Sequence, residues 1–140
     1  MSDFSSRPAR DSDIPVIMTL LDDAGFLTPG ARYDTPEYFI QSVTDGIFFV
    51  ATDSHDHVIG MIHGERLMCN GAVLWYFVVH PDFRGRGVGD MLIIRFQDFC
   101  RANQITWIFG SSDINPRTQK FYTKHGFDLS TEYIEFTKNL

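Results

Sequence analysis

The amino-acid sequence predicts an α/β domain built on a mixed sheet, with a strand-to-helix crossover near the centre of that sheet. The chain has 140 residues, of which 44% are hydrophobic, so it can bury a core without a disulfide or metal staple. Apolar residues follow helical spacing in some segments and form continuous extended runs in others. A glycine-rich turn at 84–89 joins an apolar strand to a helical segment in mid-chain.

The first half of the chain predicts a strand, two helices and two paired strands. Residues 4–10 suit a short strand, and Asp11 or Ser12 is suited to cap the helix that follows and ends at Gly25. A second helix is expected after a cap at Thr35, with proline at its first position. The next two extended segments, expected to pair as antiparallel strands, are 47–51 and 58–67.

The second half begins with a hairpin signal. Asn70-Gly71 favours a type I′ turn, because such a turn needs positive φ at both central residues. This turn leads into an apolar strand over 73–80 and then into the glycine-rich turn. The remaining elements expected in order are a helix over 92–100, a strand over 105–109, a short helix from a cap at Asn115 to Gly126, and two last strands over 127–129 and 133–137.

The charge balance and the cysteines exclude several classes of protein. The 12 basic and 18 acidic residues give a net charge of −6, which argues against nonspecific nucleic-acid binding. Apolar runs are too short for a membrane-spanning helix, and five aspartates interrupt the first 25 residues, so we expect a cytoplasmic protein without a membrane partner. Cys69 and Cys100 are expected to be reduced thiols, and no spacing indicates a metal site.

The glycine-rich turn, Arg84-Gly-Arg-Gly-Val-Gly89, has the composition of a phosphate-binding turn. Its amides are able to converge on an anion at the positive N-terminus of the next helix, and Arg84 and Arg86 add positive charge. The turn matches neither the Rossmann fingerprint nor the P-loop, since no lysine follows Gly89. The alternative is a tight strand-to-helix connection whose arginines are merely solvated.

A second motif, Asn115 to Phe127, places an Asn cap, an aromatic pair and a Gly-Phe stop on one short helix. Together the two motifs resemble the GCN5-related N-acetyltransferase (GNAT) superfamily. Its R/Q-x-x-G-x-G/A acetyl-CoA loop matches Arg84-x-x-Gly87-x-Gly89, and its N-x-x-A-x-x-F/L-Y-x-x-x-G-F pattern is similar to Asn115–Phe127. The resemblance implies a single N-acetyltransferase domain over 1–140, with a mostly antiparallel central sheet and helices on both faces.

The resemblance also implies acetyl-CoA as co-substrate, with no metal. Family members place the pantetheine arm against the fourth strand, which corresponds here to Phe77, Val78 and Val79. Asn115 would lie close to the cofactor, and Tyr122 would contact it and act as general acid toward the departing thiolate. A packing role for Tyr122 is the alternative. The turn residues expected to hold the pyrophosphate are Arg84, Gly85, Arg86, Gly87, Val88 and Gly89.

The general base is not where many family members carry it, because residues 73–79 contain no carboxylate. On the preceding strand, His63 and Glu65 share one face, since strand side chains alternate. We predict that Glu65 draws the amine proton directly or through water, while His63 has a suitable unperturbed pKa. The alternatives are that this face meets solvent or a helix, and that a water chain takes the proton.

The expected function is direct transfer of an acetyl group from acetyl-CoA to a primary amine within one ternary complex. The segments expected to shape the acceptor pocket, 26–38 and the surroundings of Trp75 and Tyr133, are aromatic and include Asp34 and Glu37, which suits a cationic small amine. Two alternatives stay open, a protein or peptide N-acetyltransferase and a non-catalytic acyl-CoA-binding module. A homodimer is also kept open.

Overall fold

The computed structural model describes residues 3–27, 34–132, 134, 136–138 and 140. The chain divides into two compact units, Met1–Gly110 and Ser111–Leu140. Among the described residues, no helix is both long and apolar enough to cross a membrane. The assignment of one acetyltransferase domain to the whole chain stays a prediction.

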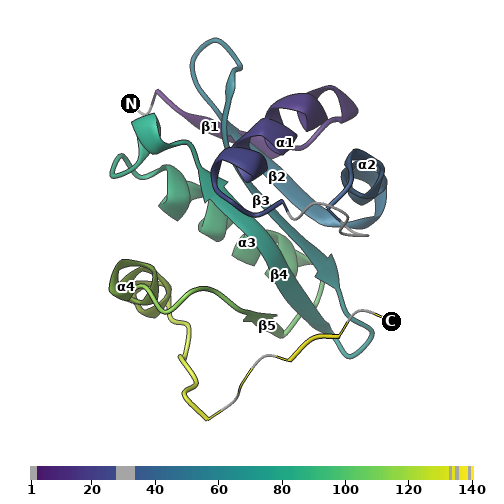
Figure 1. Cartoon of the computed structure of the whole chain (residues 1–140), viewed down its shortest axis with the longest axis vertical. Coiled ribbons are helices and arrows are strands. Elements are labelled where there is room, and N and C mark those ends of the chain that lie inside the picture. The colour runs from purple at the N-terminus through teal and green to yellow at the C-terminus, as the bar shows by residue number, and fades with distance from the viewer. Residues whose placement is uncertain (1–2, 28–33, 133, 135, 139) are drawn as a thin grey trace. The chain divides into compact units, whose positions relative to one another are not determined.

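The first unit contains a five-stranded sheet in the order β1-β2-β3-β4-β5 (Figure 1). The first four strands pair antiparallel, and β5 pairs parallel with β4. The predicted mixed, mostly antiparallel sheet is therefore confirmed. The strands are β1 (Ser5–Pro8), β2 (Ile47–Thr52), β3 (Val58–Arg66), β4 (Gly71–Val79) and β5 (Trp107–Gly110).

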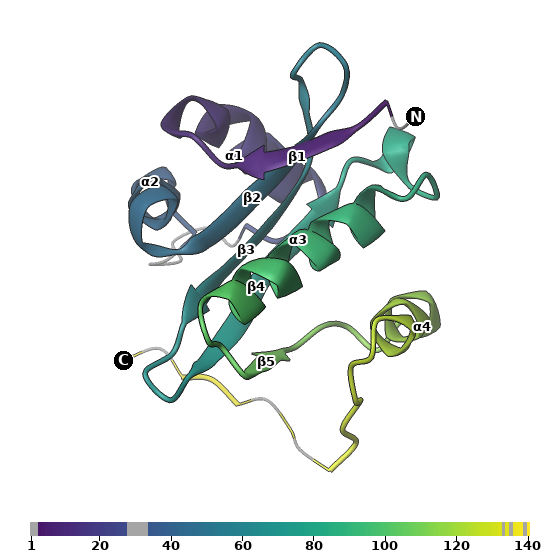
Figure 2. The same cartoon turned by 180° about the vertical axis from the view of Figure 1, so that it is seen from behind.

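Helices cover both faces of this sheet, as expected. Figures 1 and 2 show α1 and α2 on one face and α3 on the other. On the first face Ile17 and Phe39 pack with Met61 in one apolar cluster. On the second face Leu92 and Phe96 of α3 are fully buried. The helical segments of this unit are η1 (Asp11–Asp13), α1 (Ile14–Asp23), α2 (Pro36–Asp45), η2 (Pro81–Phe83) and α3 (Val88–Ala102), where η marks a 3-10 turn.

The start of α1 differs from the prediction. Asp11 and Ser12 do not cap it, because the chain first makes the 3-10 turn η1. The Asp13 carboxylate accepts the backbone N–H of Arg10 at 2.8 Å, so it is Asp13 that satisfies the exposed amide at this entry. The predicted cap of α2 is confirmed, since Thr35 Oγ1 accepts the N–H of Tyr38 at 3.2 Å.

The turn between β3 and β4 is not the predicted type I′ turn. Asn70 has φ 59°, but Gly71 does not have positive φ and already begins β4. The loop closes through a bond from the Leu67 N–H to the Gly71 carbonyl at 2.8 Å. Glycine is needed here for a different reason, because a Cβ on Gly71 would lie 2.6 Å from the Trp107 ring.

The second unit contains the predicted short helix, α4 (Pro116–Lys124), which is followed by Gly126 at φ 84°. The two strands predicted after it are wrong for the described residues, which form no strand at 127–129 or at 134, 136 and 137. The Phe127 N–H instead donates to the Tyr122 carbonyl at 3.0 Å and completes the helix end. Apolar alternation alone does not make a strand without a ladder partner. Tyr133 and residue 135 lie outside the described residues.

Candidate functional site

The glycine-rich turn bends the chain from η2 into α3 through two left-handed residues. Gly85 has φ 73° and Gly87 has φ 85°, and Gly87 is the residue that precedes the helix. Apart from the glycine and its two chain neighbours, no described atom lies within 4 Å of a Cβ built on either residue, so there is open space beside the turn. Both positions therefore favour glycine because of the backbone conformation, and the space beside them can admit a ligand.

The backbone amides of this turn are available to an anion. Within the described part of the chain, the N–H groups from Gly85 to Gly89 donate no hydrogen bond. They lie at the N-terminus of α3, a helix of 15 residues, whose dipole favours negative charge there. The side chain of Val88 is buried and anchors the first turn of the helix. The arrangement is suited to bind a phosphate group.

The two arginines of the turn contact different neighbours. Arg84 donates from Nε to the carbonyl of Val79 at 3.2 Å and so ties the turn to the end of β4. The Cζ atom of Arg86 lies 4.9 Å from the centre of the Phe4 ring. The predicted positive charge is therefore beside the turn, with each side chain held by a different neighbour.

Strand β4 loses one neighbour halfway along its length. It pairs with β3 up to Val79, whereas β5 accompanies it only from Gly71 to Leu74. No described strand continues the ladder on the β5 side beyond Leu74. Residues Phe77, Val78 and Val79, which the resemblance assigns to the pantetheine arm, lie in this later half of the strand. A strand edge of this kind can accept the amide groups of an extended ligand.

A β-bulge lies where the β5 pairing ends. His63 is opposite Tyr76 and Gly64 is opposite Leu74, so Trp75 is the extra residue of β4. Its side chain is 49% exposed. The sequence analysis missed this bulge, and the signal that could have indicated it is the glycine inside β3. A Cβ on Gly64 would lie 2.2 Å from the carbonyl oxygen of Val73.

The face of β3 that carries His63 is covered by helices, which is the alternative left open in the sequence analysis. The His63 ring is fully buried and contacts Tyr38 and Phe39 of α2. Burial lowers the pKa of His63 to about 4, although Glu65 opposes the shift. The unperturbed pKa that would suit a general base therefore does not hold at this buried position, and His63 is neutral at pH 7.

One nitrogen of His63, Nδ1, has no hydrogen-bond partner among the residues that the structure describes. Ser42 Oγ lies 3.0 Å from His63 Nε2 and also 3.0 Å from the carbonyl of Tyr38. Because the single hydroxyl proton of Ser42 goes to that carbonyl, the N–H of the imidazole is at Nε2 and donates to Ser42. Nδ1 is then a buried acceptor without a partner.

Glu65 lies at the edge of this buried cluster and is half-buried. Tyr38 donates its phenolic proton to Glu65 Oε1 at 2.6 Å. Burial, reinforced by Glu65, raises the pKa of Tyr38, so the phenol stays protonated. The carboxylate of Glu65, the predicted base, is thus held by the neutral phenol of Tyr38, a partner that the sequence analysis did not identify.

A second carboxylate lies among the aromatic residues of the expected acceptor region. The hydroxyl of Tyr76, next to the bulge on β4, donates to Asp34 Oδ1. The Phe26 ring contacts the Tyr76 ring edge to face, with centroids 6.0 Å apart. Residues 28–33 of the predicted segment lie outside the described residues.

In the second unit, Asn115 and Tyr122 belong to one helix. Asn115 Oδ1 accepts the N–H of Arg117 at 2.9 Å, so this side chain caps α4. The Tyr122 ring packs between Phe121 and Phe127, at 5.6 Å and 5.4 Å. Burial raises the pKa of Tyr122, which keeps its phenol protonated. The cofactor roles of Asn115 and Tyr122 stay predictions.

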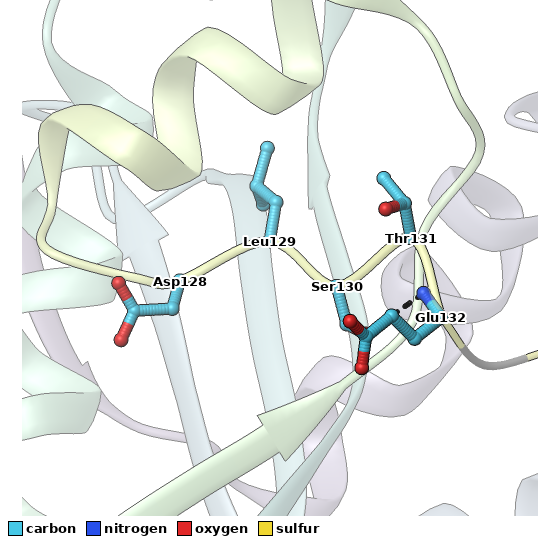
Figure 3. A pocket seen from close by; sticks show the side chains of 5 residues that line it. All are labelled: Asp128, Leu129, Ser130, Thr131 and Glu132. Atoms are coloured by element: carbon cyan, nitrogen blue, oxygen red, sulfur yellow. Dashed lines mark hydrogen bonds between the residues drawn. The ribbon is translucent and has the colours of Figure 1, made fainter.

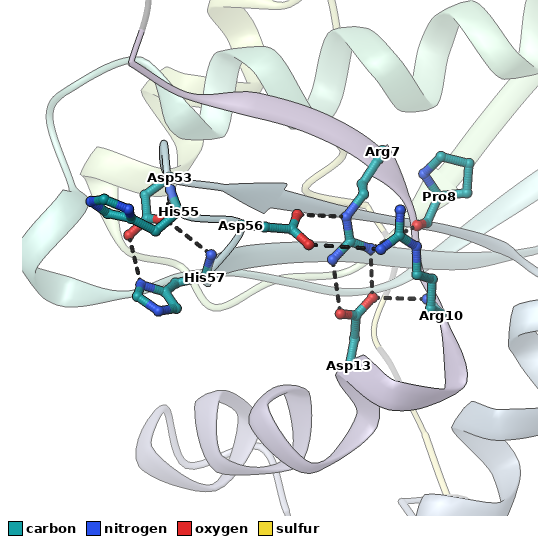
Figure 4. Close-up of polar contacts among 8 residues, drawn as sticks. All are labelled: Arg7, Pro8, Arg10, Asp13, Asp53, His55, Asp56 and His57. Carbon is teal, nitrogen blue, oxygen red and sulfur yellow. Dashed lines mark hydrogen bonds and ion pairs between the residues drawn. The ribbon is translucent and has the colours of Figure 1, made fainter.

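An ion-pair cluster ties β1 to the start of α1 (Figure 4). Arg7 binds Asp13 through two bonds of 2.8 and 3.0 Å and also binds Asp56 at 3.0 Å. Burial by itself would raise the pKa of Asp13, but the bonds from Arg7 and Arg10 outweigh it and lower that pKa. Arg7 therefore has a structural role in joining β1 to the start of α1.

Two surface pockets have no predicted site residue in their lining. One lies beside the ion-pair cluster of Arg7 and Asp13. The other is formed by consecutive residues after α4, where the Glu132 N–H donates to Ser130 Oγ at 3.3 Å (Figure 3). Among the described residues, no group of three His, Cys, Asp or Glu side chains is placed to hold a metal ion.

Comparison with known proteins identifies a family for this chain. The family model described as Acetyltransferase (GNAT) family matches residues 16–127. An acetyltransferase of Pectobacterium atrosepticum is 30% identical over 93 residues, which cover 65% of this chain and 63% of that protein. The match thus spans less than two thirds of the length of this curated relative.

Solved structures share the fold at low sequence identity. The PaiA N-acetyltransferase of Thermoplasma acidophilum, in complex with coenzyme A, has a TM-score of 0.76 and 17% identity, covering 93% of this chain and 92% of that chain. An aminoglycoside acetyltransferase from an uncultured soil metagenomic sample, in complex with sisomicin, has a TM-score of 0.76 and 16% identity, covering 99% and 97%. At these identities the likeness concerns the fold.

Proposed function

The chain belongs to the acetyltransferase (GNAT) family, and from this we propose that it transfers the acetyl group of acetyl-CoA to a primary amine by direct attack in a ternary complex. The proposed acceptor is a cationic small molecule. The observation that carries the proposal is the turn from Gly85 to Gly89, whose amides make no hydrogen bond within the described chain at the start of α3.

The residues present fit coenzyme A. The turn offers free amides, open space beside Gly85 and Gly87, and the positive end of a long helix, which together suit a pyrophosphate. The later half of β4 offers an edge without a further described strand, which suits the amides of a pantetheine arm. The thioester of acetyl-CoA would supply the acetyl group. The solved relative in complex with coenzyme A supports this choice of co-substrate.

Two groups of the chain would move protons in the proposed reaction. Glu65 would accept the proton of the acceptor ammonium, directly or through a water, with its carboxylate oriented by Tyr38. Tyr122 would donate its phenolic proton to the departing sulfur, and its raised pKa keeps that proton in place at neutral pH. The proton from the acceptor amine would go to Glu65 Oε, and the proton for the departing sulfur would come from Tyr122 Oη.

The proposed acceptor class rests on the carboxylates and aromatic rings of the region beside the bulge. Asp34 and Glu65 are carboxylates, and each accepts a hydrogen bond from a tyrosine of the same aromatic region. Carboxylates backed by aromatic rings favour a cationic amine. The solved relative in complex with sisomicin is an aminoglycoside acetyltransferase, which supports a small polyamine-like acceptor for this chain.

The experiment is a screen of small amines and peptides with acetyl-CoA that detects released thiol, together with the melting temperature in excess acetyl-CoA. We expect acetyl-CoA to raise the melting temperature, because it binds the native state. Thiol release with small cationic amines supports the proposal. If thiol is released only with peptides, the acceptor is a peptide. If acetyl-CoA binds and no thiol is released with any acceptor, the protein is a non-catalytic acyl-CoA-binding module. No thermal shift at millimolar acetyl-CoA would overturn the proposal as a whole.

A further inference from the structure

Arg86 is held in an aromatic clamp, which we define as Phe4 together with Phe83. The Cζ atom of Arg86 lies 4.9 Å from the centre of the Phe4 ring and 5.5 Å from that of the Phe83 ring. The two rings meet edge to face at 5.8 Å. Phe4 precedes β1 and Phe83 ends η2, so the clamp joins segments that are far apart in the sequence.

The clamp holds the charge of Arg86 without using its hydrogen-bond donors. Within the described residues, the guanidinium of Arg86 makes no hydrogen bond and no ion pair, and the side chain is exposed. The other arginines of this region differ. Arg84 donates to the carbonyl of Val79, and Arg7 is bound by Asp13 on one side and by Asp56 on the other.

The N–H donors of the Arg86 guanidinium lie at the proposed phosphate-binding turn. Arg86 stands between Gly85 and Gly87, both at positive φ, in the middle of the turn whose amides make no hydrogen bond within the described chain. A guanidinium has the planar fork of donors that binds a phosphate with two bonds. A cation–π contact favours one placement of a long side chain that would otherwise sample many.

We propose that the aromatic clamp orients Arg86 to bind a phosphate group of coenzyme A. Phe4 is then a positioning residue, and the segment before β1 becomes part of the cofactor site. This inference rests on the proposed function, because it needs coenzyme A at the turn. Its physical basis is preorganisation: a side chain already held in place loses less freedom when the ligand binds.

The test measures the Kd of coenzyme A for the intact protein and for Phe4→Leu, Arg86→Gln and the double variant. We expect Arg86→Gln to raise Kd by about tenfold or more, as for a lost hydrogen bond to a charged group. We expect Phe4→Leu to raise it by about fivefold, as for the ordering of one long side chain. In the Arg86→Gln background, Phe4→Leu should have no further effect, because the two residues act together.

A second readout separates phosphate binding from a general effect on the fold. Acetyl-pantetheine carries the thioester but no phosphate, so both variants should keep the kcat/KM of the intact protein with it. With acetyl-CoA, KM should rise and kcat should stay the same. If the variants bind both coenzyme A and 3′-dephospho-CoA more weakly, the phosphate that Arg86 contacts is the pyrophosphate. If they bind only coenzyme A more weakly, it is the 3′-phosphate. Either result supports the proposal.

Arg95 supplies a matched control. Its Cζ lies 4.9 Å from the centre of the Phe49 ring, which is the same kind of contact on the body of α3 rather than at the turn. Arg95→Gln should leave the Kd of coenzyme A unchanged. Phe83→Leu gives a second clamp variant should Phe4→Leu fail to fold.

The proposal is overturned if the intact protein binds coenzyme A and the clamp variants bind it equally well. It is also overturned if acetyl-pantetheine turnover falls as much as acetyl-CoA turnover, because Phe4 would then act on the fold. These outcomes leave the proposed function standing. If the intact protein binds no coenzyme A, the proposed function fails and this inference fails with it.

Discussion

The phenol of Tyr38 on α2 donates a 2.6 Å hydrogen bond to Glu65 Oε1 at the end of β3. The two residues are 27 positions apart, so the bond links a helix to the sheet that it covers. A carboxylate held by one oxygen keeps its remaining lone pairs for another donor. The contact therefore leaves Glu65 able to accept a proton while limiting the directions in which it points.

The first prediction concerns this pair. Glu65→Gln should lower the acetylation rate by about 10²-fold or more, as for a lost general base, chiefly below the pKa of the amine, where proton removal limits attack. Tyr38→Phe should lower it less, because the carboxylate remains and only its orientation is lost. The measurement is the pH–rate profile of both variants. A Glu65→Gln profile like that of the intact protein would remove Glu65 from the mechanism.

The second prediction concerns Tyr122. Tyr122→Phe keeps the ring between Phe121 and Phe127 and deletes only the hydroxyl, so the free energy of unfolding should barely change. Turnover should fall by roughly 10²–10⁴-fold, as for a lost general acid. The Kd of acetyl-CoA should change by less than about tenfold, because the turn amides provide most of the binding. Near-normal turnover would return Tyr122 to a packing role.

The third prediction uses two glycines with the same backbone conformation. Gly87→Ala and Gly25→Ala both place a Cβ at positive φ, 85° and 80°, with no described neighbour within 4 Å. Each should therefore cost about 1–2 kcal/mol in the free energy of unfolding. Only Gly87→Ala should raise the Kd of acetyl-CoA, since its methyl group enters the space beside the turn amides. Equal Kd values, measured by calorimetry, would place the phosphates elsewhere.

The fourth prediction concerns the acid sensitivity of the fold. The pKa of His63 is lowered to about 4 in the native state, against 6.5 in the unfolded chain. Between these values the unfolded state binds more protons, so stability falls as the pH drops through this window, by up to about 3 kcal/mol. His63→Leu should remove the part of the acid-induced loss of stability that comes from this histidine. Urea unfolding at pH 7.5 and pH 4.5 measures it, and equal losses in both proteins would contradict the assignment.

Much of the fold follows from local signals in the sequence. The caps at Thr35 and Asn115 are confirmed, because a cap depends only on residues within one turn of the helix. The glycine-rich turn can likewise be predicted from the sequence, since backbone positions with positive φ favour glycine. Gly85 and Gly87 therefore make the turn before α3 predictable from the sequence.

The surroundings of the proposed base depend on long-range contacts that periodicity does not reveal. His63 and Glu65 were expected on one face of a strand, but which helix covers that face depends on how α2 packs. The bulge at Trp75 depends on the register between β3 and β4, which alternating residues do not specify. The described residues of the two strands predicted at 127–129 and 133–137 form no strand for a similar reason, because apolar alternation does not supply a partner.

The end of β5 at the bulge also bears on self-association. Among the described residues, no strand pairs with β4 on the β5 side beyond Leu74. Long flat strand edges pair with strands from other molecules and so promote aggregation. A bulge increases the local twist of a strand, and a twisted, short edge is a poor template for another β-strand. The extra residue at Trp75 therefore disfavours edge-to-edge pairing along the later half of β4, where no described strand pairs with it on the β5 side.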